Sequence, residues 1–94
     1  MSEVYKALAD PTRRRILQLL REKEMTAGEI ADHFDLAKPT LSGHFAVLRE
    51  ARLVQPEKSG TTITYRLNVS VLEEALLALM DGFRLGETTK GKKP

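Results

Sequence analysis

The sequence predicts a mainly α-helical fold with one small β-hairpin, in the element order α-α-α-α-β-β-α. Two helical segments between residues 26 and 50 are separated by a turn of three or four residues. A pair of short alternating segments follows directly after the second helix, as in a hairpin. The last helical segment carries more apolar surface than so short a chain can cover, which predicts a homodimer.

The length of 94 residues fits one domain, placed at residues 1–86, followed by a basic tail at 87–94. The tail lacks large apolar side chains and is expected to be disordered. The chain has no cysteine, which excludes disulfides and thiolate metal sites. It starts without an apolar signal region and has no apolar run of about 18 residues, so we expect a cytoplasmic protein without a membrane partner.

The basic residues are concentrated in the middle of the chain, although the formal net charge is only +2. Residues 36–68 carry five basic and two acidic side chains, whereas residues 1–35 and 69–86 are each net acidic. A local excess of cations is typical of a surface that binds nucleic acid. An excess of this size also arises by chance, so it supports that function only together with other features.

The first two helices are predicted at residues 2–9 and from Pro11 onward. Asp10 can cap the second helix, and Pro11 suits its first turn because the missing N–H would have no helical partner. Three consecutive arginines at positions 13–15 lie near this N-terminus, where the helix dipole disfavours cations. These arginines could bind a phosphate or pair with carboxylates of neighbouring helices. A solvated surface with one ion pair is the simpler interpretation.

The third helix has the clearest start in the sequence. Thr26 and Glu29 have the spacing of a capping box, and we expect the helix to end near Asp35. The next helix begins at residues 37–39 and runs to about residue 50. Two helices joined by so short a turn form a helix-turn-helix, in which the second helix enters the major groove of DNA.

One side of that second helix is apolar and the other side is suited to DNA. Leu41, Phe45 and Leu48 form a stripe at helical spacing that can anchor the helix to a core. The remaining surface, here called the reading face, has few carboxylates and comprises Lys38, Thr40, Ser42, Gly43, Ala46 and Arg49. Phosphates repel carboxylates, and short polar groups reach base edges. Considered alone, the segment fits an ordinary core helix equally well.

The helical period changes after residue 53. Ile63, Tyr65 and Leu67 alternate with polar residues, which predicts a hairpin over about residues 54–67 with Gly60 in its turn. A hairpin after a helix-turn-helix is a wing, and Lys58 at its tip can meet a phosphate or the minor groove. The combined pattern predicts a winged helix-turn-helix that binds double-stranded DNA.

The last helix has a second capping-box pattern at Ser70 and Glu73 and is apolar around more than half of its circumference. A second copy of the chain is the simplest partner for this surface, although a fully internal helix is the alternative. The candidate dimerisation residues lie on this helix and on the first one: Val4, Tyr5, Leu8, Leu72, Leu76, Leu79, Met80 and Phe83.

Four motifs in register resemble the ArsR/SmtB family of winged-helix bacterial repressors, and within it the SdpR-type subgroup without metal ligands. They are A-L-A-D-P-T-R-R-R-I-L at 7–17, M-T-A-G-E-I-A at 25–31, K-P-T-L-S-G-H-F-A-V-L-R-E-A at 38–51 and I-T-Y-R-L at 63–67. The resemblance implies a homodimer built from the first and last helices. It also implies recognition helices in successive major grooves of a near-palindromic operator, and repression of transcription.

The sequence departs from many members of that family in having no recognisable metal site. The third helix has no cysteine, and the last helix has carboxylates but no histidine. Because carboxylates alone hold Zn²⁺, Ni²⁺ or Co²⁺ poorly, we expect no metal and no other cofactor. His44 belongs to the family's S-x-H motif, and it fits either a DNA contact or a structural hydrogen bond between helices.

The candidate DNA-binding residues are Lys38, Pro39, Thr40, Ser42, Gly43, His44, Arg49, Arg52, Lys58 and Thr61. Gly43 and Ala46 are small where relatives often carry longer polar side chains. Either DNA approaches Gly43 closely, or the specificity depends on the other contacts and on DNA shape. Arg52 stands where the family usually has a helix-ending glycine, so a left-handed backbone there would carry strain.

Two other functions compete with DNA binding. A winged helix with weakened DNA binding can serve as a protein–protein interaction module, which Gly43, Ala46 and the neutral body of the chain favour. An enzyme is disfavoured because the sequence has no cysteine, no readable histidine–carboxylate pair and no glycine-rich phosphate loop. The sequence therefore predicts a DNA-binding repressor that is not an enzyme.

Overall fold

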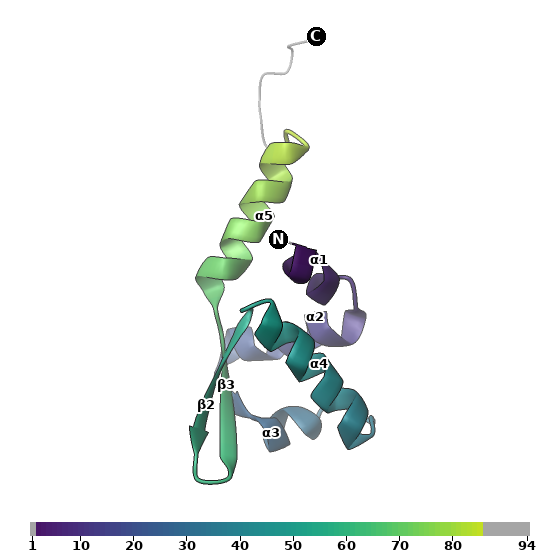
Figure 1. The fold of residues 1–94 in the computed structure, drawn as a ribbon, viewed down its shortest axis with the longest axis vertical. Coiled ribbons are helices and arrows are strands. Elements are labelled where there is room, and N and C mark those ends of the chain that lie inside the picture. Colours follow the sequence, from purple (N-terminus) through teal and green to yellow (C-terminus); the bar gives the residue numbers. More distant parts are fainter. Residues whose placement is uncertain (1, 86–94) are drawn as a thin grey trace.

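The computed structural model describes residues 2–85, and the predicted tail at 87–94 lies outside them. The elements follow one another as α1 (Ser2–Leu8), α2 (Pro11–Glu22), β1 (Met25–Thr26), α3 (Ala27–Ala31), α4 (Lys38–Glu50), β2 (Val54–Ser59), β3 (Thr62–Leu67) and α5 (Val69–Gly82). The predicted winged helix-turn-helix is confirmed, with one additional strand. Helices α1 to α4 and the sheet form one body, and α5 projects from it (Figure 1).

The core lies where α2, α3 and α4 meet the sheet. Its largest fully buried side chains come from all of these elements or the turns beside them: Ile16, Ile30, Leu48 and Leu53. The apolar stripe predicted on α4 is confirmed, because Leu41, Phe45 and Leu48 are all buried. Because this side of α4 is buried, the opposite side of the helix faces outward.

The sheet has three antiparallel strands in the order β1-β3-β2. The predicted hairpin is confirmed, and its register pairs Val54 with Leu67 at the base and Ser59 with Thr62 at the tip. The strand β1 was not predicted, since two residues are too few to show a period-2 pattern. It forms because Met25, which is buried, lies opposite the buried Tyr65 of β3.

Helix α3 begins as predicted but ends earlier. Thr26 Oγ1 accepts from the Glu29 N–H at 3.1 Å, and Glu29 Oε1 accepts from the Thr26 N–H at 2.8 Å, which completes the capping box. The expected end near Asp35 is wrong, because α3 stops at Ala31. The His33 and Phe34 N–H groups bond carbonyls only three residues back, so the chain tightens into a turn before α4.

The arginine run at the start of α2 binds the C-terminal carbonyls of α1. Arg13 donates from Nε to the Ala7 carbonyl at 3.0 Å and from Nη2 to the Lys6 carbonyl at 2.9 Å. Arg14 donates from Nη1 to the Leu8 carbonyl at 2.8 Å. Cations near a helix C-terminus are favourable, so these contacts offset the poor placement at the N-terminus of α2.

Helix α5 begins directly after β3 and not at the predicted cap Ser70. Its N-cap is Asn68, which makes no side-chain cap bond, and the Asn68 N–H donates to the Leu53 carbonyl at 2.9 Å. This hydrogen bond to the turn after α4 fixes the backbone just before α5, and the helix therefore starts without a cap from Ser70. Only Ala75 of α5 is fully buried, while Val71 and Leu72 pack partly against the core.

Candidate nucleic-acid interface

The start of α4 and the tip of the β2–β3 hairpin lie toward the same end of the molecule, opposite α5, with α3 between them (Figure 1). The chain reaches this arrangement because the stripe of α4 packs on the core beside the sheet. The ten candidate DNA-binding residues all lie on α4, on the turn that follows it or on the hairpin. Nine of them are exposed, and His44 is half-buried.

The first turn of α4 is open and free of carboxylates. Its N-cap is Ala37, which makes no side-chain cap bond, and Pro39 lies in the first turn. The side chains of Lys38, Thr40 and Ser42 are exposed there. The N–H groups of this turn are therefore not capped by a side chain, and such groups favour an anion.

The position of α4 is fixed by an aromatic contact with the sheet. The rings of Phe45 and Tyr65 are stacked, with centroids 4.7 Å apart and an interplanar angle of 22°. Arg49 donates from Nη1 to Tyr65 Oη at 3.3 Å, although its side chain is otherwise exposed. These contacts hold the helix that carries the reading face against the strand that leads to the wing.

The middle of the reading face carries no large side chain. A Cβ built on Gly43 meets no atom within 4 Å, and Ala46 is exposed. Nothing in the described chain therefore requires a glycine at position 43. The space around it is available to a ligand that approaches the backbone.

We expect Gly43→Ala to stabilise the fold by about 0.5–1 kcal/mol, because alanine loses less backbone entropy in a helix than glycine. If DNA lies close to the Gly43 backbone, the same change weakens operator binding. Urea denaturation and fluorescence anisotropy measure the two effects. Gly82→Ala at the end of α5 is the matched control: its Cβ also meets open space, and it should leave DNA affinity unchanged.

Three exposed cations surround the reading face without an ion pair among the described residues: Lys38, Arg52 and Lys58. On the wing, Arg66 Nη1 lies 3.6 Å from Glu57 Oε1, so the charges of these two side chains neutralise each other. Gly60 at the wing tip has φ of 62°, and Thr61 beside it is exposed. The positive charge available to a ligand is therefore carried by the start and end of α4 and by the wing.

Arg52 has a left-handed backbone, with φ of 62°, at the position where the resemblance implies a helix-ending glycine. The Arg52 N–H donates to the Arg49 carbonyl at 2.9 Å, and the Leu53 N–H donates to the Leu48 carbonyl at 3.1 Å. This pair of bonds is the usual glycine-type helix ending, here with an arginine at the left-handed position. The side chain is exposed, so its charge remains available to a phosphate.

We expect Arg52→Gly to raise the free energy of unfolding by about 1 kcal/mol, since glycine has no Cβ to strain in this conformation. The substitution should also weaken DNA binding through the loss of one cation. Chemical denaturation and operator titration test both parts. Stabilisation without any loss of affinity would show that Arg52 does not contact DNA.

His44 lies at the junction between helices and not on the reading face. Its Nδ1 is 3.1 Å from Arg13 Nη1 and 3.6 Å from Asp10 Oδ2, and its side chain is 17% exposed. Of the two roles considered from the sequence, the structure shows the hydrogen bond between helices. The sequence did not assign Arg13 to this junction, because 31 residues separate the two partners.

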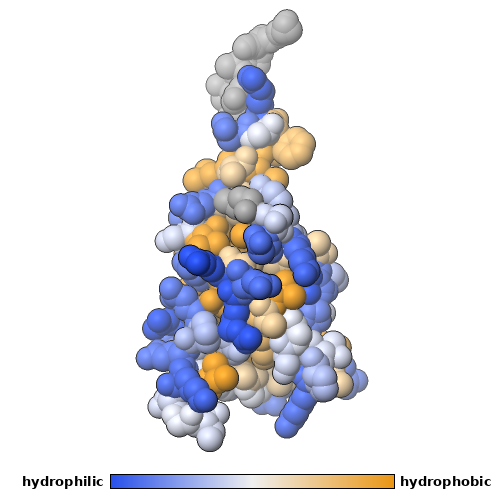
Figure 2. Space-filling model, in the orientation of Figure 1, coloured by the Kyte–Doolittle hydropathy of each residue, from blue (hydrophilic) through white to orange (hydrophobic). Residues whose placement is uncertain are grey.

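Apolar side chains gather on the projecting helix α5, as the orange surface at the upper end of Figure 2 shows. Leu76, Met80 and Phe83 of the dimerisation set are exposed there, and Tyr5 of α1 is exposed as well. Val4 does not belong to this surface, since it is only 6% exposed and packs in the chain's own core. Leu77, absent from the predicted set, is 63% exposed.

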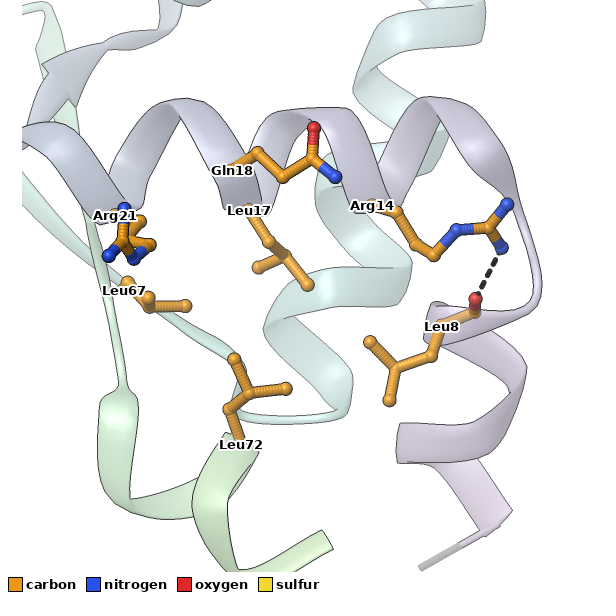
Figure 3. A pocket seen from close by; sticks show the side chains of 7 residues that line it. All are labelled: Leu8, Arg14, Leu17, Gln18, Arg21, Leu67 and Leu72. Carbon is orange, nitrogen blue, oxygen red and sulfur yellow. Dashed lines mark hydrogen bonds between the residues drawn. The ribbon is translucent and has the colours of Figure 1, made fainter. Parts of the chain in front are cut away.

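An apolar groove of about 190 Å³ lies between α2 and the base of α5. Four leucines line it, namely Leu8, Leu17, Leu67 and Leu72, and Arg14, Gln18 and Arg21 complete the wall (Figure 3). Leu8 and Leu72 of the predicted dimerisation set are half-buried here. The unpartnered apolar surface of α5 therefore continues into the body of the protein through Leu72.

Residues 2–85 contain no group of three or more histidine, cysteine or acidic side chains that could hold a metal ion. Within the same residues, no helix is long and apolar enough to cross a membrane.

Comparisons with known proteins agree with this architecture. Residues 10–55 match the family model described as bacterial regulatory protein, arsR family. The chain is 40% identical over 87 residues to the transcriptional repressor SdpR of Bacillus subtilis, covering 93% of this chain and 97% of that protein. It is 38% identical over 73 residues to the arsenical resistance operon repressor of Staphylococcus xylosus, covering 78% and 70%.

Solved structures give the same result. The crystal structure of an ArsR family transcriptional regulator superposes with a TM-score of 0.77 and 30% sequence identity, covering 92% of this chain and 91% of the other. The structure of NolR from Sinorhizobium fredii has a TM-score of 0.69 and 31% identity, covering 85% and 80%.

Proposed function

The chain belongs to the ArsR family of bacterial regulatory proteins, and we propose that it is a dimeric repressor of transcription that binds a near-palindromic operator. The curated relatives named above are repressors. A repressor acts on DNA in the cytoplasm, and we propose that location for this protein. The proposal needs no metal or other cofactor and assigns no enzymatic activity.

The exposed, carboxylate-poor reading face of α4 is the observation that carries the proposal. Its inner side is buried, so the outer side is free to enter a major groove. Lys38, Arg52 and Lys58 then lie where they can contact phosphates on either side of that groove. Gly43 and Ala46 allow the backbone to come close to the base edges.

The exposed apolar surface of α5 supports the dimer. Closed two-fold symmetry lets the same surface of each copy cover the other. Such a dimer presents two copies of α4 on one side of the molecule, and we propose that they are spaced about 34 Å apart, one turn of duplex DNA. The two copies would then read the two halves of an inverted repeat.

Fluorescence anisotropy with labelled promoter DNA tests the proposal at several salt concentrations. We expect specific binding whose affinity falls steeply as salt rises, because cations released from the phosphates favour the complex. Weak binding that ignores the DNA sequence would contradict it. Capture of a protein that docks on residues 36–53, together with absent operator binding, would favour the interaction module.

We expect Lys38→Gln to weaken binding to all DNA sequences alike and to reduce the slope of log K against log salt by about 1. The reason is that Lys38 is exposed at the first turn of α4, where its ammonium can neutralise one phosphate. Lys6→Gln on α1 is the control, because it removes another exposed cation away from the reading face. A change of slope in both variants would show that the effect comes from net charge alone.

A further inference from the structure

Helix α5 has an apolar groove at its base and an exposed aromatic ring at its other end. The groove, here called the leucine groove, has a volume of about 190 Å³ and is lined by Leu8, Leu17, Leu67 and Leu72 (Figure 3). At the other end of the helix, Phe83 is the C-cap residue and is 72% exposed. Both features would be stabilised by leaving water.

Phe83 cannot fill the leucine groove of its own chain. Leu72 in the groove wall and Phe83 are eleven positions apart, which is about 16 Å along the helix. The segment at 86–94 does not suit the groove either, because it has no large apolar side chain and its three lysines have the same charge as the arginines in the groove wall. The occupant of the groove therefore comes from another molecule.

The leucine groove has the size and the chemistry to hold a phenyl ring. An apolar cavity of about 150 Å³ is large enough to bind benzene, so this groove has room for the ring. The Arg14 guanidinium is held at its rim by a bond from Nη1 to the Leu8 carbonyl at 2.8 Å. A guanidinium over the face of an aromatic ring is attracted to it, which favours an aromatic occupant over an aliphatic one.

The apolar stripe of α5 has the same spacing in both directions along the helix. Its members follow one another at intervals of four, three and four positions: Leu72, Leu76, Leu79 and Phe83. Two copies that pack antiparallel with these stripes facing each other are therefore in register. Leu76 then lies opposite Leu79 of the second copy, and Leu72 lies opposite Phe83 of the second copy.

The two-fold axis of a dimer can run along α5 or across it. An axis along α5 makes the two helices parallel, so that one leucine groove faces the other and one Phe83 ring faces the other. An axis across α5 makes the helices antiparallel and places the Phe83 ring of each copy beside the leucine groove of the other. Because apolar surface is stabilised by closely packed atoms, the antiparallel arrangement is the one that fills both grooves.

We propose that Phe83 of each copy occupies the leucine groove of the other, so that the two α5 helices run antiparallel and each groove is complete only in the dimer. The inference rests on the proposed function, since it assigns the contact that holds the proposed dimer together. It brings Leu8 of α1 and Leu72 of α5, which are both half-buried in the single chain, into one interface. The Phe83 ring is the anchor of that interface and is present twice.

The dissociation constant of the dimer, measured by sedimentation equilibrium, tests the role of Phe83. We expect Phe83→Ala to raise it by at least about 100-fold, because a buried aromatic anchor dominates an interface and the dimer has two of them. The ring is exposed in the single chain, so its removal leaves the fold intact. Leu77→Ala is the matched control: Leu77 is 63% exposed on the same helix but lies outside the stripe, and the constant should stay within about twofold of the wild type.

A mixed dimer shows directly where the ring lies. One copy carries isotope-labelled leucine methyl groups and the other copy is unlabelled, so that nuclear Overhauser effects can be filtered for contacts between the copies. We expect such contacts from the Phe83 ring to the methyl groups of Leu17, Leu67 and Leu72. Native mass spectrometry of the same dimer should give the mass of two chains alone.

Three results would overturn the inference: absence of these contacts, contacts from one Phe83 ring to the other, or an unchanged dissociation constant in Phe83→Ala. Extra mass from a small molecule bound in the leucine groove in place of the ring would overturn it as well. In each of these cases, specific operator binding by a dimeric wild-type protein would leave the proposed function intact. A monomeric wild type without specific operator binding would instead reject the proposed function, and the inference with it.

Discussion

Leu76→Asp is expected to separate the dimer and with it to abolish specific operator binding. Leu76 is exposed on the apolar side of α5, so a carboxylate there leaves the monomer core intact. In a two-fold dimer the change buries two unpaired carboxylates, and each such charge costs several kcal/mol. The dissociation constant of the dimer should rise by about two orders of magnitude or more. Sedimentation equilibrium and anisotropy on operator DNA measure the two consequences.

Ala78→Asp is the matched control on the same helix. Two residues along an α-helix turn the side chain by about 200°, so Ala78 points away from the Leu76 side. It is exposed, and the same carboxylate there should leave both the dimer and the operator affinity unchanged. A monomeric wild-type protein at working concentrations, or full operator affinity in Leu76→Asp, would contradict the proposed assembly.

Phe45→Ala is expected to have the largest effect on stability. Its ring is buried, stacks on Tyr65 and joins α4 to the middle strand of the sheet. Truncating a buried phenylalanine costs about 3–5 kcal/mol, through lost burial and the cavity left behind. A domain of this size has a total stability of about 5–15 kcal/mol, so the variant should be close to unfolding. Urea denaturation followed by circular dichroism gives the difference.

Tyr65→Phe separates the ring contact from the hydrogen bond to Arg49. The aromatic stack remains, and the 3.3 Å contact from Arg49 to the Tyr65 hydroxyl is lost. We expect a cost below about 1 kcal/mol, as for a single hydrogen bond near the surface. A loss as large as that of Phe45→Ala would mean that the hydroxyl, and not the stack, holds α4 to the sheet.

Features set by local chemistry could be predicted from the sequence. The stripe of α4 follows from apolar spacing, and the start of α3 follows from the Thr26–Glu29 capping box. The left-handed backbone of Arg52 was suggested by the resemblance, because the family usually has a helix-ending glycine at this position. In each case the residues that decide the structure lie within a few positions of one another.

Features set by contacts between distant segments could not be predicted. β1 forms because it pairs with the edge of β3, and its two residues show no alternating apolar pattern of their own. Ser70 has the sequence of a cap, but the bond between Asn68 and Leu53 fixes the chain before that cap can act. The partners of Arg13 lie in α1 and 31 positions away at His44, so the run of arginines gives no sign of which one enters the junction.

The projection of α5 beyond the body bears on how the proposed dimer assembles. Its one fully buried side chain, Ala75, gives a lone copy little to hold this helix in place. In the proposed dimer a second copy would cover α5, so the stability of the protein would depend on its concentration. If two copies pair as proposed, repression would begin only above the concentration at which they pair.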